Sequence, residues 1–441
     1  MHRDGEPAVR HLSLDHRGEE LLVRDLSVAA AAHDVRPRTP RLRRVVCTDM
    51  KTVYLDHAAT TPTDEAVVRE MLPYFSSCFG NASSLHKDGR EAVAAVDKAR
   101  ERVAKALGAA ANEIYFTSGG TEADNWAVKG LVLANDKKGK HIVASPVEHP
   151  AVLGALDDLA KMGYEVTYLP VDQAGRVSVQ DVAAALRDDT VLLTVMYVNN
   201  EVGSVNPIKE IAAIAKERGV LFHTDAVQAA GVFRIDVKEL GVDALTISGH
   251  KFYGPKGVGA LYLKKGVRIK GLIRGGEQER SLRGGTYNTP AIVGLGTAIE
   301  KATESLEKTA SHLSELKSYF QREIESLGFT RINGGEPAHP GILNVLFYGV
   351  KNSELLSALD QAGIEASAGS ACSSGSVEPS HVLTAMGLSE KDVRASVRFS
   401  FGRENTLGEA DQAISALKSV LPRLRREEDL FILRPSDKTD L

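Results

Sequence analysis

The chain has 441 residues, of which 43% are hydrophobic and 25% charged, and its formal net charge is −4. This balance is ordinary for globular proteins and gives no reason to expect nucleic acid or a membrane as the main partner, and no apolar run approaches the roughly 18 residues of a membrane helix. The three cysteines, Cys47, Cys78 and Cys372, have no paired spacing. This argues against a disulfide framework and a CxxC metal site, and it favours a reducing, cytoplasmic compartment.

Residues 1–49 differ in composition from the rest of the chain. They hold nine arginines, no lysine and eight acidic residues. A targeting peptide would be poor in acidic residues, so this interpretation is disfavoured. A disordered natural extension is an alternative, but we favour a start codon set too early, with Met50 as the true start, and exclude 1–49 from the fold prediction.

From Met50 onward, short β-rich runs alternate with helical stretches. The runs are "EIYFTS", "HIVASP", "EVTYLPV", "VLLTVMYV", "GVLFHTD", "DALTIS" and "GALYLKK". Between two of them, "PIKEIAAIAKERG" predicts a helix with Pro207 in its first turn, one apolar face and Gly219 at its end. This alternation predicts an α/β domain with a mainly parallel sheet over residues 66–305.

Helical patterns dominate the residues from 306 to 425. Two β-rich runs, "GILNVLFY" and "ASVRFSFG", interrupt them. We therefore predict a smaller α+β domain over 306–425, an N-terminal segment over 50–65 that packs with it, and a tail over 426–441.

Three polar clusters follow strand-like runs, where ligands collect in parallel sheets. "FTSGGTEADN" places Gly120 and Thr121 at a helix start, which suits a phosphate, although any capped helix start has the same pattern. "HTDAVQ" ends a strand at Asp225, either a helix cap or a carboxylate that needs a cation, such as a protonated pyridine nitrogen. "SGHKFYGPKG" flanks Lys251 with His250 and Ser248 and suits a lysine that forms a Schiff base, although a solvated loop lysine is the common alternative.

Single residues elsewhere complete the list of candidates. His149 in "VEHPAV" is suited to stacking on a planar cofactor and to moving protons, and Asn200 in "VNNEVG" to binding a ring hydroxyl. Arg398 in "VRFSFGR" is suited to binding a substrate carboxylate. Cys372 lies in "SAGSACSSGSVEP", among small flexible residues, where we expect an exposed nucleophile on a mobile loop or an incidental loop thiol.

Together these motifs resemble a pyridoxal-phosphate enzyme of fold type I, and more narrowly a cysteine desulfurase of the NifS/IscS family. The resemblance runs from about Val53 to about Asn405 and also includes "YLDHAATTP", "GNASSLH", "GGEQERSLRGGT" and "GSACSSGSVEPSHVL". It implies a large domain with a mainly parallel seven-stranded sheet flanked by helices, a smaller α+β domain, pyridoxal 5'-phosphate as cofactor and a homodimer. The implied reaction converts L-cysteine to L-alanine and leaves a persulfide on Cys372.

The resemblance also implies a role for each matching residue. Lys251 would carry the cofactor and shuttle a proton, and His149 would stack on the ring and exchange protons. The remaining cofactor contacts would be Asp225 to the ring nitrogen, Gln228 and Asn200 to the ring hydroxyl, and Gly120, Thr121, Ser248 and His250 to the phosphate. Thr286 would reach the phosphate of the partner subunit, and Arg398, with Asn81 nearby, would bind the substrate carboxylate.

The C-terminal stretch "LPRLRREEDLFILRPSDKTDL" departs from the tail by which IscS-type enzymes dock the iron–sulfur scaffold. The sulfur acceptor is therefore either an iron–sulfur scaffold or a tRNA-thiolating enzyme. A selenocysteine lyase or another fold type I lyase or transferase stays open as an alternative, because a shared fold does not settle the reaction. A non-catalytic scaffold protein is disfavoured, since Lys251 is present.

Overall fold

The structure, a computed structural model, describes residues 52–369 and 379–425. The chain divides into one unit, Met1–Asp49, and a second, Met50–Leu441, to which all the described residues belong. The interpretations of residues 1–49, of the tail 426–441 and of the loop around Cys372 therefore lie outside the described residues.

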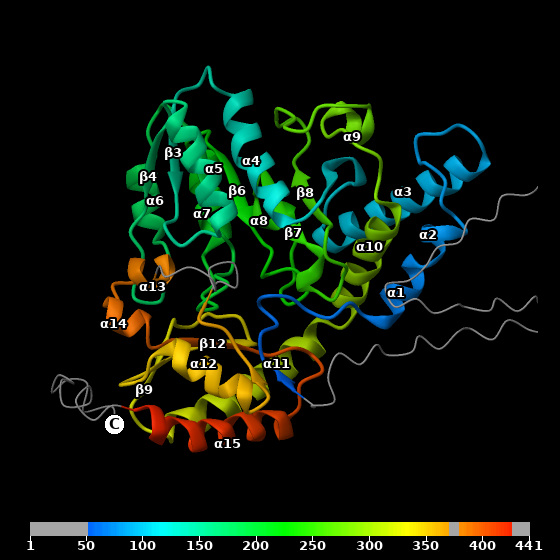
Figure 1. Cartoon of the computed structure of the whole chain (residues 1–441). Coiled ribbons are helices and arrows are strands. Elements are labelled where there is room, and N and C mark those ends of the chain that lie inside the picture. The colour runs from blue at the N-terminus through cyan, green and yellow to red at the C-terminus, as the bar shows by residue number, and fades with distance from the viewer. Residues whose placement is uncertain (1–51, 370–378, 426–441) are drawn as a thin grey trace, which may run out of the picture. The chain divides into compact units, whose positions relative to one another are not determined.

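A seven-stranded sheet forms the centre of the larger layered part (Figure 1). The strands pair in the order β2-β8-β7-β6-β5-β3-β4; β8 runs antiparallel to both β2 and β7, and the other four pairs are parallel. Their bounds are β2 Ile114–Thr117, β3 His141–Ala144, β4 Glu165–Tyr168, β5 Thr190–Thr194, β6 Leu221–Asp225, β7 Ala244–Ser248 and β8 Gly259–Leu263. The predicted α/β class and seven-stranded, mainly parallel sheet are confirmed, and each of the seven β-rich runs forms one strand.

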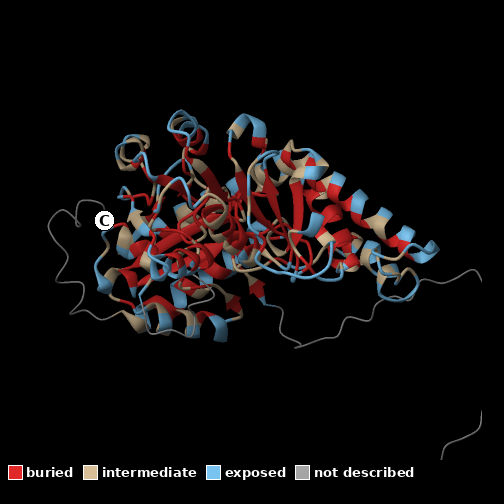
Figure 2. Ribbon diagram, turned by 90° about the horizontal axis from the view of Figure 1, so that it is seen from above, coloured by how far each residue is buried: buried red, intermediate tan, exposed pale blue. Residues whose placement is uncertain are grey.

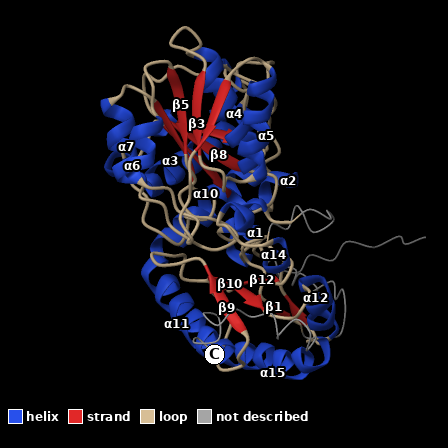
Figure 3. Ribbon diagram, turned by 90° about the vertical axis from the view of Figure 1, so that its left-hand side faces the viewer, coloured by secondary structure: helices blue, strands red, loops and turns tan. Residues whose placement is uncertain are grey.

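Helices cover both faces of this sheet (Figure 3). One face packs against α4 (Gly120–Ala134) and α5 (Pro150–Lys161), and the other against α3 (Lys87–Leu107), α6 (Val179–Ala185), α7 (Ile208–Glu217) and α10 (Thr289–Glu304). The central strands are therefore buried on both sides, which is why β5, β7 and β8 are fully buried along their lengths. Figure 2 shows strands between the helices in the red of buried residues. Helix α7 has the predicted apolar face, with Ile208, Ile211, Ala212 and Ala215 buried.

A second, antiparallel sheet has the order β12-β10-β9, with β9 at Thr330–Asn333, β10 at Ile342–Phe347 and β12 at Ser396–Ser400. It shares a hydrophobic core with helices α11 (Leu306–Glu325), α12 (Asn352–Gln361) and α15 (Leu407–Leu424). Strand β1 (Val53–Tyr54) pairs in parallel with β11 (Ile364–Glu365), and Val53 belongs to the same core. The exact domain limits stay predictions.

Short helices connect these layers. They are α1 Glu65–Met71, α2 Pro73–Ser76, α8 Val237–Leu240, α9 Gln278–Ser281, α13 His381–Ala385 and α14 Glu390–Val393, with single 3-10 turns at Ala111–Glu113 and Gly249–Lys251. Among the described residues, no helix is both long enough and apolar enough to cross a membrane.

Candidate active site

A cavity of about 170 Å³ lies where the parallel strands end and α4 begins. Nine of the predicted cofactor residues line it together with Arg398: Gly120, Thr121, His149, Asn200, Asp225, Gln228, Ser248, His250 and Lys251. The nine cofactor residues lie between Gly120 and Lys251, and the parallel sheet brings them to one edge because its strand ends point the same way, whereas Arg398 comes from β12 of the second sheet.

One end of the cavity is rich in unpaired donors. The turn from β2 enters α4 through Gly119, and a Cβ added to Gly120 would lie 3.2 Å from Cβ of Ser248, so the backbone here approaches the β7 end closely. Within 52–369 and 379–425, the hydroxyls of Thr121 and Ser248 have no hydrogen-bond partner. The first N–H groups of a 15-residue helix attract an anion, so this end of the cavity suits a phosphate.

Asp225 supplies a buried carboxylate at the end of β6. Its Oδ1 accepts a hydrogen bond of 2.8 Å from the backbone N–H of Val227. Burial raises the pKa of Asp225 to about 6, although the Val227 N–H and the charge of Lys251 partly oppose this. A second buried carboxylate, Asp124, lines the same cavity; its Oδ1 has no hydrogen-bond partner among the described residues, and His223 Nε2 lies 3.6 Å from it. Burial, followed by the charge of Asp225, raises the pKa of Asp124 as well.

Lys251 is held by the N-terminal segment of the chain. Its Nζ donates hydrogen bonds to the carbonyl oxygens of Ala58 (2.5 Å) and Ala59 (2.8 Å). Gln228 Nε2 donates to the same Ala58 oxygen at 2.9 Å, and His250 Nδ1 lies 3.1 Å from Oγ1 of Thr60. The motif "YLDHAATTP" therefore forms one wall of the site. This motif contributes to the family resemblance, but the sequence pattern predicted no role for its residues.

His149 occupies the N-cap of α5 and borders the cavity. Its Nδ1 accepts a hydrogen bond of 3.1 Å from the N–H of Ala151, which leaves the proton of the neutral ring on Nε2. Burial, followed by the charges of Lys251 and His381, lowers the pKa of His149 to about 4. The ring is therefore neutral at physiological pH, with Nε2–H as its donor.

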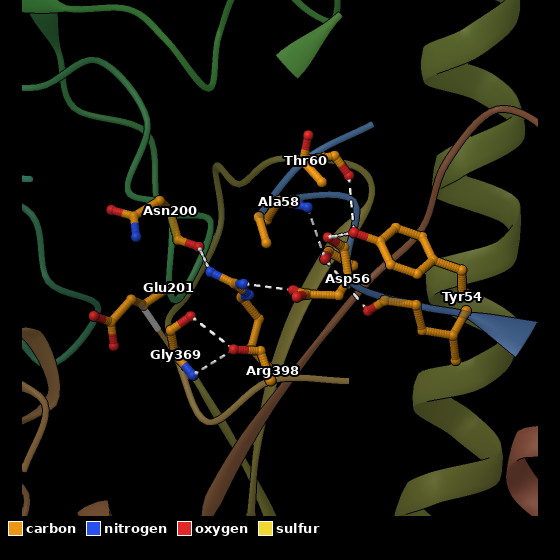
Figure 4. Close-up of polar contacts among 12 residues, drawn as sticks. Tyr54, Asp56, Ala58, Thr60, Asn200, Glu201, Gly369 and Arg398 are labelled. Atoms are coloured by element: carbon orange, nitrogen blue, oxygen red, sulfur yellow. Dashed lines mark hydrogen bonds and ion pairs between the residues drawn. The ribbon is translucent and has the colours of Figure 1, made fainter. Parts of the chain in front are cut away.

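Arg398 projects from β12 and is almost completely buried, with 1% of its surface exposed. Its Nη2 donates to Asp56 Oδ1 at 2.6 Å and its Nη1 to the carbonyl oxygen of Asn200 at 2.8 Å, while Nε has no partner among the described residues (Figure 4). The guanidinium thus lies at the cavity with its Nε–H lacking a hydrogen-bond partner among the described residues. Asp56 is a site residue that the sequence analysis missed, although "YLDHAATTP" contains it.

Two predicted residues, Asn81 and Thr286, do not line this cavity, and a third, Cys372, is not described. Asn81 is exposed, and its Oδ1 accepts from the N–H of Ser83 at 2.9 Å. Thr286 is exposed in the loop between α9 and α10, and its predicted contact concerns a partner subunit. Cys372 lies outside the described residues. The roles of all three stay predictions.

Comparison with known proteins places this site in a family. The model of the family "Aminotransferase class-V" matches residues 53–412. The chain is 48% identical over 390 residues to "Cysteine desulfurase IscS" of Methanosarcina thermophila, covering 87% of this chain and 96% of the relative. It is 49% identical over 378 residues to "Putative cysteine desulfurase IscS 1" of Bacillus subtilis (strain 168), covering 85% and 100%.

Solved structures agree with these relatives. A "NIFS-LIKE PROTEIN" superposes with a TM-score of 0.81 at 38% identity, covering 85% of this chain and all of the other. The structure "SspA in complex with cysteine" gives a TM-score of 0.72 at 39% identity and covers 80% of this chain and all of the other.

Proposed function

We propose that this chain, which belongs to the class-V aminotransferase family, converts L-cysteine in the cavity around Lys251. It is a pyridoxal-phosphate-dependent cysteine desulfurase of the NifS/IscS family with a type I fold. The observation that carries this proposal is that Lys251, Asp225 and the anion-binding start of α4 line one cavity.

The cavity fits pyridoxal phosphate at three points. The α4 start, with the hydroxyls of Thr121 and Ser248, would hold the phosphate. Asp225 would face the ring nitrogen, and a pyridinium charge there would stabilise a carboxylate whose pKa burial raises. Lys251 Nζ, near the carbonyls of Ala58 and Ala59, would form the covalent link. Gln228 and Asn200 would bind the ring hydroxyl, and His149 would lie against the ring face.

The bound cofactor supplies an electron sink for the negative charge that develops when substrate Cα loses its proton. Lys251 would remove this proton and return one later, because it is the basic group that substrate binding frees from the covalent link. The neutral His149 ring would exchange protons on the other side of the site. Asp225, kept ionised by its partner, would hold the proton on the ring nitrogen.

Arg398 would bind the carboxylate of L-cysteine with its guanidinium, since Arg398 lines the cavity. The Cys372 thiolate would then attack the substrate sulfur. The S–S bond of a persulfide forms, the substrate C–S bond breaks, and its electron pair remains with the substrate Cβ. Protonation of that carbon gives L-alanine.

The test is L-alanine formation from L-cysteine with a thiol reductant in wild type, Cys372→Ser and Cys78→Ser. Cys78 is the matched control, since it is the free cysteine within the described part of the chain. We expect the Cys78 variant to make alanine and sulfide at the wild-type rate and the Cys372 variant to make neither. Equal alanine formation by all three would exclude Cys372 as the sulfur acceptor.

The active protein is, in this proposal, a homodimer in which Thr286 reaches the partner's phosphate. Support comes from exposed large apolar side chains on two neighbouring segments: Leu72, Phe75, Phe79, Leu85, Leu272 and Ile273. The segments are joined by a hydrogen bond of 3.4 Å from Gln278 Nε2 to Ser83 Oγ. Exposed apolar side chains gathered in this way are typical of subunit interfaces. Sedimentation equilibrium tests the dimer, and Phe79→Asp should shift it towards monomer.

The persulfide sulfur is proposed to pass to a second protein, either an iron–sulfur scaffold or a tRNA-thiolating enzyme, in the cytoplasm. The scarcity of cysteines and their lack of pairing support a reducing compartment, in which a thiol nucleophile stays reduced. Transfer of ³⁵S from the loaded enzyme to each class of acceptor, with Cys372→Ser as the control, distinguishes the two acceptors.

A further inference from the structure

Strand β2 lies at the edge of the seven-stranded sheet, and side chains satisfy its outward backbone groups. The Phe116 N–H donates to Glu279 Oε2 at 3.0 Å. The carbonyl oxygen of Ile114 accepts from Arg100 Nη1 at 2.8 Å and from Arg280 Nη2 at 3.0 Å. Unpaired edge groups need such partners when they are buried. The segment around Glu279 is therefore attached to β2, the strand that leads into the turn before α4, where we place the phosphate.

Glu279 is fixed there by a buried ion pair. Its two carboxylate oxygens accept from Arg100 Nη1 at 2.8 Å and Nη2 at 2.6 Å. The exposed fractions of the two side chains are 9% for Arg100 and 1% for Glu279. Bidentate pairing of this kind sets both distance and orientation, and removing one partner leaves a buried charge without compensation. The position of Glu279 relative to α3 and β2 is thus strongly determined.

The backbone at this point is held in an unfavourable conformation. Glu279, Arg280 and Ser281 have φ values of 45°, 57° and 63°, all in the left-handed region that residues other than glycine rarely adopt. Three such residues in succession persist only where surrounding contacts determine them, and such strain is concentrated at functional sites. The buried ion pair of Glu279 provides one of those contacts.

A second attachment follows directly. Arg283 Nε and Nη2 donate to the two carboxylate oxygens of Glu122 at 2.8 Å and 3.0 Å. Glu122 lies in the first turn of α4, and its Oε2 also accepts from the Ser118 N–H at 2.8 Å. The exposed Thr286 comes three residues after Arg283, so its loop is tied to the same β2–α4 turn that carries Gly120 and Thr121.

We propose that Glu279 is a positioning residue that holds the strained turn so that Thr286 completes the cofactor phosphate site of the other subunit. This inference rests on the proposed homodimer and on the proposed role of Thr286. Glu279 touches neither cofactor nor substrate in it. Its effect passes through the backbone of residues 279–286, and the affected site is the partner's.

The first test is the dissociation constant of pyridoxal phosphate in Glu279→Gln dimers, measured by absorbance titration of the cofactor-free protein. Loss of one well-aligned hydrogen bond to a charged phosphate corresponds to an increase of about tenfold or more. Glu277→Gln is the matched control, since Glu277 lies two residues away in an exposed position. We expect wild-type binding in the control, and wild-type binding in Glu279→Gln as well would overturn the proposal.

The decisive test determines in which subunit's site the cofactor affinity falls. A heterodimer of one Glu279→Gln subunit and one Lys251→Ala subunit, isolated through two different affinity tags, has one intact Lys251, and the intact loop facing it comes from the Lys251→Ala subunit. Borohydride reduction attaches the bound cofactor permanently to Lys251. Intact-mass measurement then gives the fraction of Lys251 subunits that carry cofactor at each cofactor concentration, and hence the affinity. We expect wild-type affinity at this Lys251. Affinity as weak as in the Glu279→Gln homodimer would mean that the damage stays within the subunit, and would refute the proposal.

Two further variants keep the result interpretable. If Glu279→Gln does not fold, Arg283→Met takes its place in the same heterodimer, because the Arg283–Glu122 pair is less buried, at 22% and 13% exposed. Thr286→Ala in the heterodimer tests the proposed function itself. Recovery with Thr286→Ala but not with the positioning variants refutes only the role of Glu279. No recovery with Thr286→Ala, or a monomeric wild type by sedimentation, refutes the underlying dimer arrangement and with it this inference.

Discussion

Replacing Asp225 by Asn should stabilise the cofactor-free protein while it abolishes catalysis. Burial raises the pKa of Asp225 from 3.8 to about 6. Because the folded state holds the proton more tightly than the unfolded state, stability falls as the pH rises from about 4 to about 6 and stays lower above that. The difference of about two pKa units corresponds to about 3 kcal/mol of unfolding free energy at about pH 7.5. Asn cannot ionise, and its side-chain oxygen can still accept from the Val227 N–H.

The assay is urea unfolding of cofactor-free wild type, Asp225→Asn and the exposed control Asp188→Asn at about pH 7.5 and about pH 5. We expect Asp225→Asn to unfold at higher urea at about pH 7.5, with a smaller difference at about pH 5, and the control to stay within roughly 0.5 kcal/mol of wild type. Saturating pyridoxal phosphate should narrow or reverse the difference, because only Asp225 pairs with the pyridinium charge. A cofactor-free Asp225→Asn protein no more stable than wild type at about pH 7.5 would refute this account of the site.

Three further outcomes follow from the same geometry. Arg398→Lys should raise KM for L-cysteine about tenfold or more without changing the cofactor dissociation constant. An ammonium cannot donate to Asp56 and to the Asn200 carbonyl and also bind a carboxylate in bidentate fashion. An unchanged KM in steady-state kinetics would argue against this role. The His149 ring proton should not shift between about pH 5 and pH 8 in NMR spectra of the cofactor-free protein, since its pKa is lowered to about 4; a midpoint near 6.5 would contradict this, and His149→Gln assigns the signal. Gly259→Ala should lower the unfolding free energy by about 1–3 kcal/mol, because the new methyl would lie 2.7 Å from the Gly119 carbonyl carbon. Gly154→Ala, with open space around it, is the control. A urea midpoint of Gly259→Ala equal to that of wild type would refute the clash.

The sequence alone predicted the features that follow from local pattern. Strand–helix alternation gave the α/β class, and the 3.6-residue period gave the buried face of α7. Polar clusters at strand ends identified Gly120, Asp225 and Lys251, which line one cavity. Local rules suffice here because parallel strands present their carboxyl ends at one edge of a sheet whatever their detailed packing. The chemical roles of these residues stay predictions.

Tertiary structure alone decided the partners of these residues. Arg398 pairs with Asp56 across 342 positions of sequence. Lys251 donates to the carbonyl oxygens of Ala58 and Ala59, which precede it by 193 and 192 positions. The strands β1 and β11 are two residues each, too short to show a period. The left-handed turn at Glu279 contradicts local backbone preference and persists through a buried partner on α3. Periodicity and turn chemistry report on neighbours in sequence, so contacts between distant segments, and strain that only such contacts sustain, emerge when the chain is packed.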